Sequence, residues 1–167
     1  MVTLAELKAQ SRQRSDMEES EFVSDSELTT YINSSIAELH DLLIASYCDD
    51  YIMEEYQFTS DGTAIAYALP ADFYKVRGVD MNYGSQWVTV KRFNFNMRNQ
   101  QANQVALTFL GQPDVQYRLV GSEIRFSRVP DGTAQFRIFY HPIATKLVVD
   151  SDSFDDVNQY SEYVVVD

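Results

Sequence analysis

The sequence predicts an α+β protein with an N-terminal helical bundle (residues 1–50), packed with an antiparallel, barrel-like β domain (51–145). A C-terminal segment (146–167) that is either helical or extended follows. Three observations lead to this class. Apolar residues recur with the 3.6-residue period of a helix near the N-terminus. Between turn signals, polar and apolar residues then alternate with period two. No repeat, low-complexity tract or Gly/Ser linker separates the helices from the strands among the 167 residues.

Two capping boxes predict where the helices begin. Thr3 with Glu6 starts a short helix that ends near residue 15, and Ser24 with Glu27 starts a longer helix that ends near residue 47. The longer helix has an apolar stripe of Leu28, Ile32, Ile36, Leu39 and Leu43. Its opposite face is polar and carries Thr29, Asn33, Ser34, Glu38 and Asp41. The short helix is the expected local partner of this stripe.

The central region predicts strands joined by turns. Residues 51–59 and 63–69 form a predicted hairpin around Ser60-Asp61-Gly62, and residues 76–83 and 86–90 form another around Gly84-Ser85. The polar stretch that follows, to residue 104, is either a helix or a long loop. Three further alternating segments, 115–120, 123–127 and 134–141, predict an antiparallel three-stranded meander.

The C-terminal segment is compatible with two structures. Phe154, Val157, Tyr160, Tyr163 and Val164 have helical spacing, whereas the β-branched residues near the end favour a strand.

The charge is acidic and unevenly distributed. The 13 basic and 25 acidic residues give a net charge of −12. Residues 15–74 contain fourteen acids and no Lys or Arg, whereas residues 75–137 contain nine basic residues and four acids. Since affinity for duplex DNA comes mostly from Lys and Arg neutralising phosphates, this balance disfavours DNA binding and favours a basic protein partner or repulsion of DNA.

Residues that usually carry chemistry are sparse. The two histidines, His40 and His141, lie a hundred residues apart and offer no metal-binding cluster, and we expect His40 to be structural. The lone Cys48 has no identifiable base partner, and the Asp-rich run at 150–156 lacks the ligand spacing of a calcium loop. No phosphate-binding or nucleophile motif is present. The sequence therefore predicts no enzyme activity, no metal and no cofactor.

The expected environment is the cytosol. The sequence has no apolar run long enough for a membrane span, and its N-terminus lacks the apolar core of a signal peptide. A single cysteine also excludes an intramolecular disulfide.

Several motifs occur in a characteristic order. A Ser-Asp-x-Glu-Leu helix start at residues 24–28 follows TLAELKAQSRQRSDMEES, the segment YALPADFYKVRGV occupies residues 67–79, and Tyr-x-Glu-Tyr-Val-Val occupies residues 160–165. Together they resemble the tailed-phage head-to-tail adaptor (connector, or head-completion) proteins, over roughly the whole chain. The sequence ends before the longer C-terminal helix with which similar proteins grip the portal.

The resemblance implies a noncatalytic virion protein, assembled in the host cytoplasm. Similar proteins form a ring, usually dodecameric, that docks under the portal vertex, bridges to a tail or nozzle protein and leaves a channel for DNA. Residues 146–167 then return to the helices or reach the portal. The portal or tail contact is assigned to Tyr160, Tyr163, Val164, Val165 and Val166.

In such a ring, neighbouring subunits meet through different surfaces. We therefore expect a basic surface with Arg77 and Arg92 to face an acidic surface of the next subunit. The acidic side consists of Asp49, Asp50, Glu54 and Glu55. An acidic helix layer along the channel would repel phosphate and let the DNA slide.

Three alternatives remain open at this point. Exposed aromatics such as Tyr83 and Trp87 would serve a carbohydrate- or receptor-binding β-module of a tail. The acids Asp49, Asp50, Glu54 and Glu55 would serve a cell-wall glycosidase, although adjacent strand residues point to opposite faces. A basic aromatic patch would suit single-stranded nucleic acid, although exposed strand edges explain the same charges. Its members are Arg77, Lys91, Arg92 and Arg98 with Trp87, Phe93 and Phe95.

Overall fold

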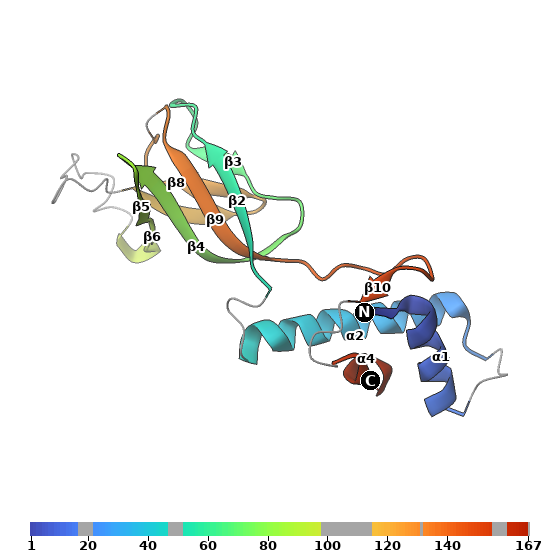
Figure 1. The fold of residues 1–167 in the computed structure, drawn as a ribbon. Helices are drawn as coiled ribbons and strands as arrows, with labels where there is room; N and C mark the ends of the chain where they lie inside the picture. The colour runs from blue at the N-terminus through green and yellow to red at the C-terminus, as the bar shows by residue number, and fades with distance from the viewer. Residues whose placement is uncertain (17–21, 47–51, 98–114, 131, 155–159, 167) are drawn as a thin grey trace. The chain divides into compact units, whose positions relative to one another are not determined.

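The computed structural model describes residues 1–16, 22–46, 52–97, 115–130, 132–154 and 160–166 (Figure 1). The chain divides into two units: residues 1–51 with 143–167 form the helical unit, and residues 52–142 form the β unit. The prediction of an α+β protein with antiparallel sheets is confirmed, but the described strands do not close into a barrel. None of the helices in the described ranges has the length and apolar character needed to cross a bilayer.

The helical unit contains α1 (Leu4–Arg14), α2 (Asp25–Ser46) and α4 (Ser161–Val166). Two short strands, β1 (Val2–Thr3) and β10 (Ser153–Phe154), pair antiparallel and bring the two ends of the chain together. Eight buried side chains fill the core of this unit: Leu4, Leu7, Ile32, Ile36, Leu39, Leu147, Val164 and Val165.

Both predicted capping boxes are present. The Thr3 N–H donates to the Glu6 carboxylate at 2.8 Å, and the Glu6 N–H donates back to the Thr3 hydroxyl at 3.3 Å. Ser24 and Glu27 repeat this exchange at 3.0 and 3.3 Å. These hydrogen bonds hold the pKa of Glu6 and of Glu27 below the ordinary value. The helices therefore begin where their first N–H groups find side-chain acceptors.

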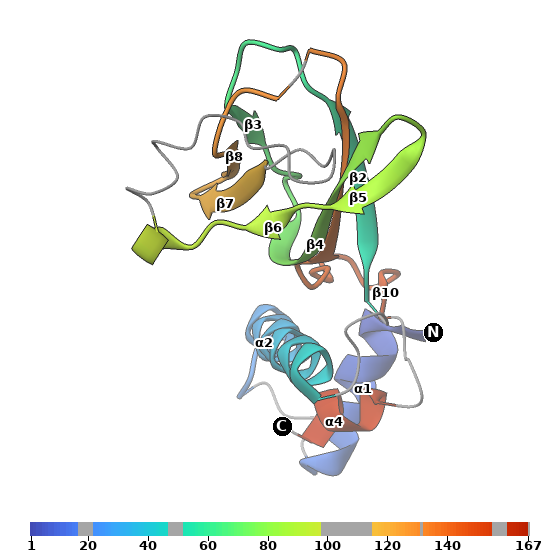
Figure 2. The same cartoon turned by 90° about the vertical axis from the view of Figure 1, so that its left-hand side faces the viewer.

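The β unit has two four-stranded sheets (Figures 1 and 2). The first has the order β2 (Glu54–Thr59), β9 (Gln135–Pro142), β4 (Phe73–Tyr83), β5 (Gln86–Thr89). The second has the order β3 (Ala66–Ala68), β8 (Glu123–Phe126), β7 (Gln116–Val120), β6 (Lys91–Arg92), and a 3₁₀ turn, η1 (Phe95–Met97), follows β6. The inward side chains of both sheets share one core, in which the rings of Phe126 and Phe136 lie 4.4 Å apart.

Two predicted hairpins are confirmed. Strands β4 and β5 pair around Gly84-Ser85, both of which have positive φ, as the tight hairpin turn requires. Strands β7 and β8 pair around Gly121, whose φ is +60°. In each hairpin, the turn residues and the alternation of polar and apolar residues indicate the same pairing register between the two strands.

The predicted hairpin between residues 51–59 and 63–69 is wrong. Strand β2 pairs with β9, and β3 pairs with β8 in the other sheet. The Asp61 carboxylate accepts hydrogen bonds from the N–H groups of Thr63 and Ala64 at 2.9 and 2.8 Å. Those bonds, together with Gly62 at φ +73°, carry the chain from one sheet to the other instead of reversing it within one sheet.

The predicted three-stranded meander is wrong in its third strand. Strand β9 leaves β7 and β8 and becomes a central strand between β2 and β4. Its inward residues Phe136, Ile138 and Tyr140 are almost fully buried, so this strand has the apolar face that a central position needs. Sequence adjacency alone does not determine which strands pair.

The polar stretch that the sequence left undecided is described in part. Residues 91–97 contain β6 and η1, and β6 pairs parallel with β7. Residues 98–104 lie outside the described ranges.

Candidate assembly surfaces

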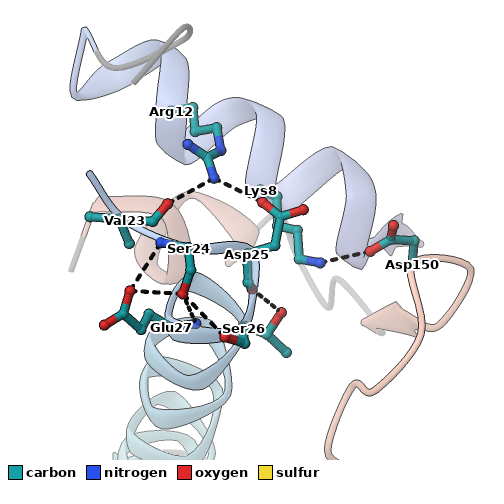
Figure 3. A network of polar contacts seen from close by, with 9 residues as sticks. Lys8, Arg12, Val23, Ser24, Asp25, Ser26, Glu27 and Asp150 are labelled. Carbon is teal, nitrogen blue, oxygen red and sulfur yellow. Dashed lines mark hydrogen bonds and ion pairs between the residues drawn. The ribbon is translucent and has the colours of Figure 1, made fainter. Parts of the chain in front are cut away.

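The three basic side chains of α1 each bind a different segment of the helical unit. The Lys8 ammonium lies 2.7 Å from the Asp150 carboxylate (Figure 3). The Arg12 guanidinium donates to the Val23 carbonyl at 3.1 Å and to the Asp25 carboxylate at 2.8 Å (Figure 3). The third, Arg14, pairs with Glu162 of α4. Such exposed ion pairs contribute little energy individually, but together they orient the segments around α1.

The net charge of the chain is carried by one unit. The helical unit contains four basic and seventeen acidic residues, a net charge of −13. The β unit contains nine basic and eight acidic residues, a net charge of +1. Since the cations of α1 are already paired, the helical unit presents a strongly negative surface.

A turn at residues 147–152 is held by hydrogen bonds to the side chains of Asn33 and Asp152. The Asn33 amide donates to the Leu147 carbonyl at 2.9 Å and accepts from the Leu147 N–H at 2.8 Å. The Asp152 carboxylate accepts from the Val148 and Val149 N–H groups at 2.7 and 2.9 Å, which lowers its pKa. Asn33 was assigned to the hydrated face of the helix; it is half-buried, and its amide binds the C-terminal segment instead.

The residues predicted to contact the portal or tail lie in and beside α4. Val164 and Val165 are buried in the helical core, Tyr163 is half-buried, and Tyr160 is 38% exposed. Val166 belongs to the helix, but its side chain lies outside the described residues. In this arrangement the segment contributes to the core of the helical unit, and its contact with a portal stays a prediction.

Two of the acids predicted for the subunit interface, Glu54 and Glu55, lie in the described part of the chain. Glu54 and Glu55 are exposed residues of β2 and point to opposite faces, as their adjacent positions require. The Tyr140 hydroxyl hydrogen-bonds with Glu54 and with Asp72, at 3.1 Å each. The pKa of Tyr140 is raised well above its usual range. Burial of the hydroxyl is the largest cause, and its hydrogen bonds to these carboxylates add to it. Asp49 and Asp50 lie outside the described residues.

The predicted basic partners lie in different sheets. Arg77 is an exposed residue of β4, and Arg92 is an exposed residue of β6. Strand β9 lies between β4 and β2 in the first sheet. Arg77 and the acids of β2 therefore belong to the same sheet. The role of these residues between subunits stays a prediction.

The outer face of the first sheet contains a side-chain cluster that the sequence analysis missed. Arg137 forms an ion pair with Asp80 at 2.8 Å, and its guanidinium lies 4.4 Å from the Trp87 ring centroid and 4.9 Å from that of Phe139. The alternation along β9 already indicates that residues 137 and 139 lie on the face opposite to its inward residues, and so on the same outer face. The guanidinium covers part of the Trp87 ring. A carbohydrate-binding module would need that ring surface free to stack on a sugar.

The two histidines lie in different units, and a pocket lies in the β unit. His141 is buried and its Nδ1 donates to the Ile52 carbonyl at 2.5 Å, while His40 is half-buried on α2. A pocket of about 570 Å³ lies beside the β4–β5 turn and the segment before β9, and Arg128 is its charged lining residue. Among the residues that the structure describes, no three His, Cys, Asp or Glu side chains come close enough to hold a metal ion.

Comparison with known protein families identifies a match over nearly the whole chain. The family model described as SU10 adaptor protein matches residues 2–166. No curated protein matches the chain.

Proposed function

The chain belongs to the SU10 adaptor protein family, a family of phage adaptor proteins, and on this basis we propose that it joins the head of a virion to its tail. It acts as a subunit of a homo-oligomeric ring, dodecameric as in similar proteins, at the portal vertex. The ring binds the portal protein on one side and a tail or nozzle protein on the other, and DNA passes through it.

The uneven charge of the two units is the observation that carries this proposal. A protein around a DNA channel has to avoid binding the phosphates that move past it. The helical unit has a net charge of −13, and the cations of α1 are bound within the unit. A surface of this kind repels DNA.

The two-unit construction also suits a connecting protein. Each unit has its own buried core, so each is able to present a separate contact surface without depending on the other for its fold. The nearly neutral β unit allows copies to pack without strong mutual repulsion.

The proposal includes no catalysis. Glu54, an acid of the glycosidase alternative, shares the Tyr140 hydroxyl with Asp72, and Glu55 points to the other face of the sheet. That pairing gives Glu54 a structural role at the end of the β core. The second alternative, sugar binding through Trp87, competes with the contact between Trp87 and Arg137.

The test is the molar mass of the purified protein by light scattering, alone and mixed with its portal protein, followed by electron microscopy of the complex. We expect ring-sized particles, or co-migration with the portal, and no retention of duplex DNA by the ring. A protein that stays monomeric and ignores the portal contradicts the proposal. Glycan arrays and cell-wall hydrolysis assays would then decide between the alternatives.

A further inference from the structure

The unpaired cations of the β unit gather on one sheet. Within the described residues, five of its basic side chains form no ion pair: Lys75, Lys91, Arg92, Arg118 and Arg128. Three of these five lie on β6 or β7, in the sheet β3–β8–β7–β6, and Arg128 lies two residues after the end of β8. In the helical unit, by contrast, each cation of α1 has a carboxylate partner.

The outer face of this sheet places like charges side by side. Arg118 and Arg125 are direct cross-strand partners in β7 and β8, an arrangement that is unfavourable without a counter-charge. Arg125 is held by Glu123 at 2.9 Å, whereas Arg118 lies over the Phe93 ring, 5.6 Å from its centroid. Lys91 is in register with Gln116, two residues before Arg118, and so belongs to the same face. Three cations therefore share this face with one carboxylate.

The helix α2 has an exposed stripe of the opposite sign. Tyr31, Glu38 and Leu42 recur at seven- and four-residue spacing and face solvent with Asp41, which lies three residues after Glu38. Tyr31 is 61% and Leu42 47% exposed. Glu38 and Asp41 form no hydrogen bond or ion pair within the described residues. An aromatic and an aliphatic side chain thus flank two unpaired carboxylates.

From this complementarity we propose that the α2 stripe of one subunit docks on the outer face of the sheet β3–β8–β7–β6 of the next subunit. Glu38 and Asp41 neutralise Arg118 and Lys91 of the neighbour, and Tyr31 and Leu42 pack beside Phe93. The inference rests on the proposed ring. It places the contact at residues other than Arg77, Arg92 and the acids of β2.

A second copy of the chain fits this face better than DNA does. The contact uses two different surfaces of one chain, as in the head-to-tail interfaces that close into rings. Each subunit supplies both the acidic and the basic half, so the charges balance at every interface. A DNA strand bound to this face would approach a protein of net charge −12, whose field opposes it. Tyr and Arg are also enriched at the centres of protein interfaces.

A charge exchange tests the contact. We expect Arg118→Glu and Glu38→Arg each to raise the protein concentration needed for ring assembly on the portal by about tenfold, and the two together to restore it to within about threefold of the original. Lys75→Glu is the matched control, because it makes the same charge change at an unpaired, exposed cation of β4, and we expect it to leave assembly unchanged. Circular dichroism checks that each variant is folded.

Cross-linking provides an independent measurement. In a Cys48→Ser background, Glu38→Cys and Arg118→Cys are placed in separate chains, and the two proteins are mixed on the portal with a short bis-maleimide. We expect covalent dimers from the mixture but none from either variant alone. Replacing Arg118→Cys by Lys75→Cys in the mixture should give no dimers.

The outcomes separate this contact from the ring itself. Rings that form normally with Arg118→Glu and give no cross-linked dimers overturn the contact and leave the proposed function standing. Loss of assembly by Arg118→Glu that Glu38→Arg does not restore, or duplex DNA binding that Arg118→Glu abolishes, assigns this face to another ligand and overturns the contact too. An unaltered protein that forms no ring on its portal overturns both.

Discussion

Replacing Asn33 by Ala should loosen the C-terminal segment from α2 and destabilise the helical unit. Asn33 is half-buried, and its amide makes two hydrogen bonds to the main chain of Leu147, at 2.9 and 2.8 Å. A hydrogen bond of this kind contributes about 0.5–1.5 kcal/mol, and the Leu147 N–H and C=O lose their partner when the amide is removed. The expected loss is about 2 kcal/mol. For a unit of this size it lowers the melting temperature by roughly 10 °C.

The two units can be followed separately in one denaturation experiment. All the described α-helices belong to the helical unit, so circular dichroism at the helical minimum reports its unfolding. Trp87 is the single tryptophan and lies in the β unit, so its fluorescence reports the other transition. We expect Asn33→Ala to move the helical transition more than the fluorescence transition.

The neighbouring substitution Ser34→Ala is the matched control. Ser34 is exposed, and within the described residues its hydroxyl donates only to the Thr30 carbonyl of its own helix, so its removal should change stability by less than about 0.5 kcal/mol. A helical transition that Asn33→Ala leaves unchanged, or shifts no further than Ser34→Ala does, would refute the role given to the amide.

Three further predictions concern the β unit. Because the pKa of Tyr140 is raised, its stabilising contribution is complete below about pH 10 and is lost as the pH rises further. The stability difference between the unaltered protein and Tyr140→Phe should therefore shrink in alkaline titrations of the unfolding free energy. Gly62→Ala should cost about 1–3 kcal/mol in urea denaturation, since the new Cβ would lie 2.7 Å from a backbone atom of the segment before β9 at φ +73°; Gly84→Ala, also at positive φ but in open space, should cost less. Arg137→Ala should uncover Trp87 and shift its fluorescence emission to longer wavelength, and an unshifted spectrum would contradict the stacking.

Local features of the fold were predictable because their causes are local. The two capping boxes and the hairpin turns at Gly84 and Gly121 depend on residues within four positions of each other, and they appear in the structure where the sequence places them. Strand pairing was not predictable in the same way. The alternation along β9 shows that one of its faces is buried, but it contains no information on which strands flank it.

Surface features of the candidate sites also differ in whether they depend on nearby residues or on contacts between distant segments. The stacking of Arg137 on Trp87 needs the register between β9, β4 and β5, which comes from pairing over distances of fifty residues. The cross-strand pair of Arg118 and Arg125 was predictable from the sequence, because the β7–β8 hairpin was predicted and the turn sets its register. Asn33 was misassigned because a polar residue on a helix faces either water or a buried main chain, and only the returning C-terminal segment decides between them.

That returning segment also changes the meaning of the charge distribution. Along the sequence, the acids occupy two separate regions on either side of a basic middle. In the fold, the second acidic region joins the first, and the basic middle becomes most of the β unit, so the separation of charge by sequence becomes a separation by unit. Within the helical unit Glu38 and Asp41, and within the β unit Lys91 and Arg118, form no ion pair among the described residues of their own unit. In the proposed ring the acidic stripe of each subunit lies on the basic face of the next, and on that proposal these charges specify how copies meet.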